Sequence, residues 1–171
     1  MAKIAINGFG RIGRLFFRQA FGHRGIDIVA INDLGDIENL AYLLKFDSVY
    51  RSYDKEVKVE RAPSGMGGTL IVAGRKIKVI SEKDMTKLPW GAMKIDVVVE
   101  STGAFESFEK ASPHVTAAGA KRVVISAPAK DDEGIAGGQT ILMGINEGNF
   151  KTCKVSSNGS CTTNATSPVV A

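Results

Sequence analysis

Apolar segments of two kinds alternate along most of the chain. Nearly continuous apolar runs, typical of strands buried on both faces of a sheet, occur at residues 3–7, 27–32, 95–100 and 122–126. Apolar residues at helical spacing predict helices over residues 12–21, 36–45 and 105–118, the last of them interrupted or capped near Pro113. Two further strands are expected at residues 140–143 and 154–157, followed by a helix from Cys161 that ends at Pro168. This alternation predicts an α/β domain with a doubly wound, mostly parallel sheet.

The middle of the chain has a different pattern. Residues 56–60 alternate strictly between charged and apolar side chains, as in a strand with one solvated face. Residues 69–72 and 76–80 are further strand candidates, and a turn is predicted over residues 65–68. We therefore expect a small antiparallel patch inserted in the middle of the parallel core.

Length and composition are those of one ordinary globular domain. The chain has 171 residues, of which 44% are hydrophobic and 23% are charged. These proportions argue against a disordered chain, a collagen-like chain and a disulfide scaffold. The net charge of +4 comes from 22 basic and 18 acidic residues, and the excess is spread out. Without a run of like charges or interleaved aromatic residues, no nucleic-acid partner is expected, whereas an anionic small molecule suits the charge.

The sequence lacks the apolar segments of secreted and membrane proteins. Residues 1–8 are too short an apolar run for a signal peptide, and no stretch approaches the roughly 18 apolar residues of a membrane span. The two cysteines, Cys153 and Cys161, lie eight residues apart. In a chain without a signal peptide, this favours free thiols in a reducing, cytoplasmic compartment. We expect neither a membrane partner nor a metal site.

A glycine motif of the form G-x-G-x-x-G spans residues 8–13, between a predicted strand and a predicted helix. In this context Gly8 permits a tight turn, Gly10 lets the backbone approach a pyrophosphate, and Gly13 lets the helix pack close to the strand. The N-terminus of the helix then offers unpaired N–H groups to the phosphates. The motif predicts a Rossmann-type dinucleotide site, and the alternative is a plain strand-to-helix turn.

An acidic residue follows the next strand at the spacing that such a site requires. Asp33 lies twenty residues after Gly13 and directly after the strand at 27–32. A carboxylate there accepts hydrogen bonds from the adenosine ribose hydroxyls and repels a 2′-phosphate. The sequence therefore favours NAD over NADP, the alternative being an aspartate that merely belongs to a turn.

Cys161 lies between a predicted strand and a predicted helix, in a segment rich in hydroxyl side chains over residues 156–164. A thiol at a helix N-terminus ionises more readily to the reactive thiolate, and the neighbouring hydroxyls suit an anionic substrate. From spacing alone, a nucleophile and a buried inert cysteine both remain open. Cys153 adjoins a strand, so we expect it to be inert.

Four motifs in register resemble glyceraldehyde-3-phosphate dehydrogenase over essentially the whole chain. They are the segments at residues 7–14 (NGFGRIGR), 100–103 (ESTG), 126–128 (SAP) and 160–164 (SCTTN). The resemblance implies a Rossmann-type fold, NAD as the cofactor, and a homotetramer as the full-length enzyme. It also implies the oxidative phosphorylation of glyceraldehyde 3-phosphate to 1,3-bisphosphoglycerate, with inorganic phosphate, in glycolysis and gluconeogenesis.

The resemblance also implies roles for individual residues. Cys161 attacks the aldehyde to give a thiohemiacetal, hydride passes to NAD, and phosphate cleaves the resulting thioester. Ser160 and Thr162 match positions that bind phosphate or substrate oxygens. The implied cofactor contacts beyond the three motif glycines are Arg11 and Ile12 at the pyrophosphate, Asp33 at the ribose, Lys83 near the adenine, and Thr102, Gly103 and Ser126 along the rest of the cleft.

The implied domain organisation is an NAD-binding domain over residues 1–157 and the start of a catalytic domain over residues 158–171. In the family, the histidine that activates the thiol comes after this point. His23 follows a predicted helix and His114 lies within one, and we expect both at the surface. The 171-residue chain is therefore expected to bind NAD but to be inactive alone.

Two alternatives stay open at this stage. Erythrose-4-phosphate dehydrogenase shares the glycine loop and the cysteine motif, although residues 126–130 look more like those of the triose-phosphate enzyme. A non-catalytic dinucleotide-binding or interaction module is the other alternative, but a retained cysteine motif has no purpose in a protein that only binds.

Overall fold

The computed structural model describes residues 1–63, 65 and 67–171. Met66, within the predicted turn at 65–68, lies outside the described residues, as does Ser64. The described strands form one nine-stranded sheet in the order β3-β4-β5-β2-β1-β6-β7-β9-β8. The strands are β1 (Ala2–Asn7), β2 (Ile26–Asn32), β3 (Val57–Arg61), β4 (Gly68–Val72), β5 (Arg75–Ile80), β6 (Val97–Glu100), β7 (Arg122–Ile125), β8 (Gly138–Thr140) and β9 (Val155–Ser157).

Helices connect most of the parallel strands. The α-helices are α1 (Arg11–Ala20), α2 (Ile37–Lys45), α3 (Phe108–Ala111), α4 (Pro113–Thr116) and α5 (Cys161–Val170). Short 3-10 helices that the sequence analysis did not predict are η1 (Met85–Lys87), η2 (Ile135–Gly137) and η3 (Glu147–Lys151). None of the helices in the described part of the chain has the length and apolar character needed to cross a membrane.

The strand pairing confirms the predicted doubly wound α/β fold. Six parallel strands lie side by side in the order β5-β2-β1-β6-β7-β9. When these six are numbered along the chain, the order is 3-2-1-4-5-6, which is the strand order of a Rossmann fold. Strands β3 and β4 extend one edge and pair antiparallel, as the alternating pattern in the middle of the chain predicts. Strand β8 extends the other edge and pairs parallel with β9.

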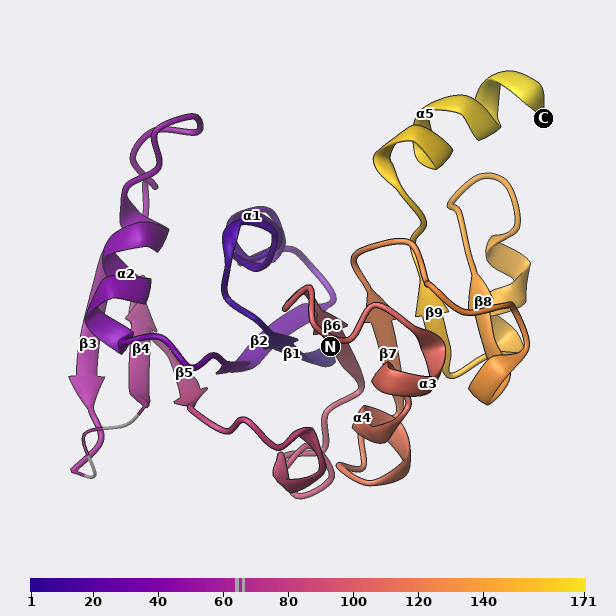
Figure 1. The fold of residues 1–171 in the computed structure, drawn as a ribbon. Helices are drawn as coiled ribbons and strands as arrows, with labels where there is room; N and C mark the ends of the chain where they lie inside the picture. The colour runs from indigo at the N-terminus through magenta and orange to yellow at the C-terminus, as the bar shows by residue number, and fades with distance from the viewer. Residues whose placement is uncertain (64, 66) are drawn as a thin grey trace.

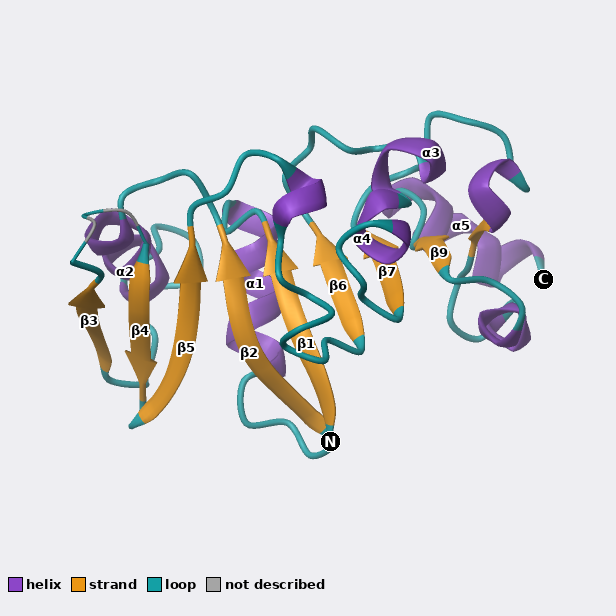
Figure 2. Cartoon of the chain, turned by 90° about the horizontal axis from the view of Figure 1, so that it is seen from below, coloured by secondary structure: helices purple, strands orange, loops and turns teal. Residues whose placement is uncertain are grey.

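The sheet is the middle layer of the molecule. Helices α1 and α2 cover one face and α3 and α4 cover the other, as Figure 1 and Figure 2 show. On the first face, Phe17 of α1 and Leu44 of α2 are fully buried in one apolar cluster with the strands. On the second face, Trp90 and Phe108 are fully buried in the other cluster. Because both faces are covered in this way, the central strands are nearly all apolar.

The predicted helix over residues 105–118 is two short helices rather than one. The side chain of Ser107 caps α3 by accepting the N–H of Lys110, so the helix begins later than periodicity suggested. Pro113 is the first residue of α4, where its missing N–H has no helical partner to lose. The predicted interruption at Pro113 is thereby confirmed.

Two other boundaries differ from the prediction. The strand expected at residues 140–143 is β8, which ends at Thr140, because the Asn146 side chain bonds to Thr140 O and to Leu142 N and turns the chain. Helix α5 continues past Pro168, where the prediction ended it. Pro168 removes one N–H from the ladder, but Ala171 N donates to Ser167 O and helical bonding resumes.

Candidate functional site

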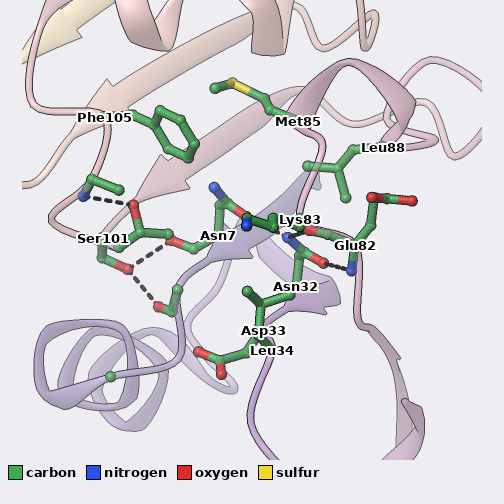
Figure 3. A pocket seen from close by; sticks show the side chains of 14 residues that line it. Asn7, Asn32, Asp33, Leu34, Glu82, Lys83, Met85, Leu88, Ser101 and Phe105 are labelled. Atoms are coloured by element: carbon green, nitrogen blue, oxygen red, sulfur yellow. Dashed lines mark hydrogen bonds between the residues drawn. The ribbon is translucent and has the colours of Figure 1, made fainter. Parts of the chain in front are cut away.

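The candidate site lies where the strand order reverses, between β1 and β6. Asn7, the last residue of β1, is opposite Asn32 of β2 on one side and Glu100 of β6 on the other. Loops leave the carboxyl ends of these strands in opposite directions and open a crevice, which is where doubly wound sheets bind ligands. A cavity of about 610 Å³ occupies this crevice (Figure 3). Its lining residues are Asn7, Gly8, Gly10, Asn32, Asp33, Leu34, Glu82, Lys83, Met85, Leu88, Ser101, Thr102, Ala104 and Phe105.

The glycine loop has the geometry that the motif predicts. Gly8 has φ +89°, and an added Cβ would stand 2.6 Å from Thr102 N. At Gly13 an added Cβ would stand 2.1 Å from Gly8 O, so only glycine lets the helix approach the loop this closely. Gly10 instead faces open space, with no described atom within 4 Å of its Cβ position. It is the N-cap of α1 and has no side chain to cap the helix, which leaves first-turn N–H groups to a ligand.

Asp33 follows β2 and is held in place from two sides. Its Oδ2 accepts the N–H of Phe9 at 2.6 Å, and its Oδ1 accepts the N–H of Gly35 at 2.8 Å. The first bond joins the acid directly to the glycine loop. Each carboxylate oxygen has further lone pairs, and the side chain lines the cavity. The arrangement suits hydroxyl donors, such as those of a ribose, and disfavours a second anion.

The other end of this cavity is apolar. Met85, Leu88 and Phe105 line it together, and Figure 3 shows them across the cavity from Asp33. Met85 opens η1, which Asp84 caps by accepting the N–H of Thr86. A flat aromatic ring such as adenine fits between apolar side chains of this kind. The sequence analysis missed all three residues, because Met85 and Leu88 lie in a segment without a motif and Phe105 is only the start of a predicted helix. Lys83 also lines this cavity.

A second cavity of about 290 Å³ continues the crevice toward β7. It shares Gly10, Ser101, Thr102 and Phe105 with the first cavity. The predicted residues that it brings together are Arg11, Ile12, Thr102, Gly103 and Ser126. An elongated ligand lying across both cavities would contact every residue predicted to bind cofactor except Gly13, which packs beneath the loop.

Cys161 is the first residue of α5 and is exposed. Helix α5 follows β9, so the thiol lies beyond the carboxyl ends of the strands, two strands along the sheet from β6. The Ser160 hydroxyl caps the helix by accepting the N–H of Thr163 at 2.9 Å, and it lies 2.7 Å from the Thr162 hydroxyl. Ser160, Cys161 and Thr162 therefore gather three polar groups at one helix N-terminus, where an anion is favoured.

The other cysteine is in a contrasting environment. Cys153 is buried, and its burial raises the pKa of the thiol, although the nearby Arg122 acts in the opposite direction. A thiol with a raised pKa forms less thiolate. The two cysteines therefore differ in exposure, with Cys161 at the surface and Cys153 in the core.

The two histidines differ in exposure. His23 is exposed after α1, as expected. The expectation that His114 lies at the surface is wrong, because its side chain has no exposed area at all. Trp90 Nε1 donates to His114 Nδ1 at 3.0 Å, and His114 Nε2 lies 2.9 Å from Glu100 Oε2. Both ring nitrogens are thus satisfied inside the core, which is what makes burial of the ring possible.

Comparisons with known proteins agree with this geometry. The family described as "Glyceraldehyde 3-phosphate dehydrogenase, NAD binding domain" matches residues 2–108. The glyceraldehyde-3-phosphate dehydrogenase of Borreliella burgdorferi is 48% identical over 172 residues, which cover 98% of this chain and 48% of that protein. The enzyme of the same name from Geobacillus stearothermophilus is 48% identical over 168 residues, covering 97% of this chain and 47% of that protein.

A third relative has a similar identity and coverage. The cytosolic glyceraldehyde-3-phosphate dehydrogenase of Trypanosoma brucei brucei is 46% identical over 167 residues, covering 98% of this chain and 47% of that protein. The chain spans about half the length of these curated relatives. The family match, the Rossmann strand order and the crevice with its glycine loop agree on the same ligand, and the chain belongs to the family of the NAD-binding domain of glyceraldehyde 3-phosphate dehydrogenase.

Proposed function

We propose that the chain supplies the NAD site and the nucleophile of a phosphorylating glyceraldehyde-3-phosphate dehydrogenase. The observation that supports this proposal is the position of Cys161. It is the first residue of α5, which follows the carboxyl end of β9, and the dinucleotide crevice also lies at the carboxyl ends of the strands. Residues 1–157 are the NAD-binding domain in this proposal, and residues 158–171 begin the catalytic one. From the resemblance alone, we extend the proposal to a homotetramer in the cytoplasm.

The chain's own residues account for the orientation of the cofactor. The apolar end of the first cavity would take the adenine, with Lys83 beside it, and Asp33 would accept the ribose hydroxyls. The N–H groups at the start of α1, near Arg11 and Ile12, would bind the pyrophosphate. Thr102, Gly103 and Ser126 would line the part of the crevice that leads toward Cys161. When bound, the oxidised nicotinamide supplies the acceptor for a hydride.

Cys161 is the group that bonds to the substrate. Its sulfur attacks the aldehyde carbon, and the carbonyl oxygen takes a proton as the thiohemiacetal forms. Loss of a hydride and a proton from that carbon and its oxygen leaves a thioester. Inorganic phosphate then attacks the thioester carbon, which releases the acyl phosphate and returns the thiolate. The hydroxyls of Ser160 and Thr162 would bind oxygens of phosphate or substrate.

The base that takes the proton is not among the histidines of these 171 residues. Both ring nitrogens of His114 bond within the core, and His23 follows α1 at the opposite edge of the sheet. We infer that the base comes from the catalytic domain. The 171-residue chain alone should therefore show little turnover, because general-base assistance is worth about 10²–10⁴-fold in rate.

The test measures NADH formation from glyceraldehyde 3-phosphate and inorganic phosphate. Three samples are compared. They are the chain alone, the chain mixed with the C-terminal half of the Geobacillus stearothermophilus relative, and the Cys161→Ser variant mixed with that same half. Turnover only in the complemented sample, lost in Cys161→Ser, supports the proposal. Fast turnover by the chain alone contradicts the missing base, and a preference for erythrose 4-phosphate assigns the chain to the sister enzyme instead.

A further inference from the structure

A line of hydrogen-bonded polar side chains runs from the core beneath α4 to the rim of the dinucleotide crevice. It consists of Trp90, His114, Glu100, Asn7 and Asn32, and we call it the buried chain. Its members are at most 6% exposed. Asn7 and Glu100 open the segments at residues 7–14 and 100–103 that carry the resemblance, whereas Asn32, Trp90 and His114 lie outside every motif. Buried polar groups at this density are costly unless every one is bonded.

Hydrogen-bond chemistry gives the buried chain one direction. An indole N–H can only donate, so His114 Nδ1 accepts from Trp90, and the ring hydrogen must then lie on Nε2. That nitrogen donates to Glu100 Oε2 at 2.9 Å. Asn7 Nδ2 donates to the same oxygen at 2.6 Å, which leaves Asn7 Oδ1 to accept from Asn32 Nδ2 at 2.7 Å. The 3.4 Å between Asn7 Nδ2 and His114 Nε2 joins two donors that share Glu100 Oε2, and is not a bond.

The far end of the buried chain requires the same direction independently. Asn32 Oδ1 accepts the backbone N–H of Glu82 at 2.9 Å, and Asn32 Nδ2 donates to the backbone oxygen of Glu82. These two bonds orient the Asn32 amide without reference to Glu100. Since the orientation set by Glu82 agrees with the one set by Trp90, every amide and ring in the buried chain has a single arrangement that satisfies all bonds.

The second oxygen of Glu100 holds the crevice itself. Glu100 Oε1 accepts the backbone N–H of Thr102 at 2.8 Å and also the Thr102 hydroxyl. Thr102 is one of the four residues that line both cavities, and its backbone stands against Gly8 of the glycine loop. The carboxylate of Glu100 therefore joins the end of β1, the loop after β6 and the core beneath α4.

We propose that Glu100 and His114 are positioning residues that hold the Thr102 loop and the glycine loop in the arrangement that NAD needs. The inference rests on the proposed NAD site, and it adds two residues to which that proposal gives no cofactor contact. His114 is fully buried, and Glu100 lies at the wall of the second cavity behind Thr102. Glu100 acts through Thr102 and Asn7. His114 acts through Glu100. Trp90 fixes the ring by donating to Nδ1, and the ring then holds the carboxylate in one orientation by donating from Nε2 to Oε2.

A selective effect on binding follows from the way Asp33 is held. Its two bonds, to Phe9 N and Gly35 N, involve no member of the buried chain. The Asn32–Glu82 pair is also complete without Glu100. Loss of the carboxylate should thus leave the adenosine end of the crevice in place and displace the end formed by Thr102. Adenosine monophosphate needs only the first end, whereas NAD needs both.

The experiment compares binding of NAD and of adenosine monophosphate, by titration calorimetry, to the 171-residue chain and four variants. In Glu100→Gln, one oxygen becomes a donor NH2 group. Turned toward Asn7 and His114, this group meets two donors, and turned toward Thr102 it meets the backbone N–H, so at least one bond is lost in either orientation. His114→Leu removes both ring bonds, while His114→Gln keeps a neutral donor and acceptor. Thr102→Ala removes one bond to Glu100 from an exposed position and leaves the core untouched. Val123→Ala lies in the same apolar cluster as Trp90 but makes no side-chain hydrogen bond to the buried chain, so it reports the effect of lost apolar packing.

We expect Glu100→Gln and His114→Leu to raise the Kd for NAD by about tenfold, as for one unpaired buried group. Their Kd for adenosine monophosphate should change by less than about twofold, a small part of one such bond. His114→Gln should recover most of the NAD affinity, and Thr102→Ala should show a smaller loss in the same direction. Thermal melting, monitored by circular dichroism, identifies any variant that fails to fold. If a core variant fails, Thr102→Ala still tests the contact between Thr102 and Glu100.

Three outcomes would overturn the inference. One is equal loss of affinity for both ligands, another is no loss for NAD, and the third is a Val123→Ala profile that matches Glu100→Gln. Failure of the proposed NAD site is a different result, since the unmodified chain would then bind neither ligand.

Discussion

Asp33 Oδ2 accepts the backbone N–H of Phe9 at 2.6 Å, so the acid after β2 and the glycine loop after β1 are held as one unit. Phe9 is itself fully buried under that loop, with its ring edge-on to Phe17 at 5.6 Å between centroids. The loop is therefore anchored from below by an apolar side chain and from the side by a carboxylate. A change at Asp33 should affect both the choice of cofactor and the shape of the loop.

The first prediction concerns that choice. The unmodified chain should bind NAD more tightly than NADP, because the Asp33 carboxylate accepts ribose hydroxyls and repels a 2′-phosphate. In Asp33→Gly the difference between the two affinities should become smaller. NADP should bind more tightly because the repulsion is removed, and NAD should bind less tightly because the loop loses its bond at Phe9. Titration calorimetry with both cofactors measures the difference.

Asp33→Asn is the matched control for the loop. An asparagine keeps one oxygen that can accept from Phe9 N but carries no charge. It should therefore raise NADP affinity while it weakens NAD binding less than Asp33→Gly does. Equal affinity of the unmodified chain for the two cofactors, or tighter binding of NADP, would contradict the assignment of Asp33.

The second prediction separates two glycines of one motif. Gly10→Ala should leave the melting temperature unchanged or slightly higher, because φ at Gly10 is −71° and no described atom approaches its Cβ position. The same methyl group should weaken NAD binding, since it stands where the pyrophosphate would approach. Gly13→Ala should mainly lower the melting temperature, because its Cβ would press against Gly8 O.

Thermal melts and NAD titrations of these two variants make the comparison. A Gly10→Ala variant that binds NAD normally would show that the pyrophosphate does not approach the loop at this position. A Gly13→Ala variant of normal stability would contradict the close packing of α1 against the loop.

Patterns in the sequence predicted the layers of the fold and the polar half of the crevice. Strands buried on both faces are recognisable because all their side chains are apolar, and the glycine loop because each glycine meets a separate backbone requirement. The apolar half was not predicted. Met85 and Leu88 lie in a segment without periodicity, and their placement depends on how η1 packs against α4, which is a tertiary relationship.

His114 shows the limit more sharply. A histidine within a predicted helix is found both exposed and buried, and nothing local to residue 114 decides between the two. It is buried because Trp90, twenty-four residues earlier, and Glu100, fourteen residues earlier, reach its two ring nitrogens. Complementary donors and acceptors that are far apart in the sequence leave no local pattern, so the buried chain could be found only in three dimensions.

The third prediction uses Tyr53, whose hydroxyl has no bonding partner among the described residues. Burial, with the neighbouring Asp54 charge, raises the pKa of Tyr53 from 10.0 to about 12, although Arg18 over the ring at 5.3 Å opposes this. Between these two values the unfolded chain has lost its proton and the folded one has kept it. The folded state is thereby disfavoured as the pH rises, and the free energy of unfolding should fall through this window.

Tyr53→Phe lacks the titrating group and should lose less stability than the unmodified chain over the same pH window. At neutral pH this substitution should be neutral or stabilising by up to about 1 kcal/mol, because it removes an unpaired buried hydroxyl. Urea unfolding at a series of pH values measures both effects. Parallel alkaline slopes for the two proteins would show that Tyr53 titrates normally in the folded state.

The fourth prediction compares the two thiols. Cys161 should be alkylated by iodoacetamide much faster than Cys153, because Cys161 is exposed at the first residue of α5 and Cys153 is buried. Burial also raises the pKa of Cys153 and so reduces its thiolate fraction at neutral pH. Limited labelling of the folded chain, followed by peptide mapping, gives the order of reaction.

Two controls separate access from chemistry in that experiment. Labelling in denaturant should bring the two rates together, since both thiols are then exposed and neither lies at a helix terminus. Ser160→Ala removes the side chain that caps α5, and it should slow Cys161 relative to the unmodified chain if an ordered helix start promotes the thiolate. Preferential labelling of Cys153 in the folded chain would contradict the placement of both cysteines. An unchanged Cys161 rate in Ser160→Ala would instead assign its reactivity to exposure alone.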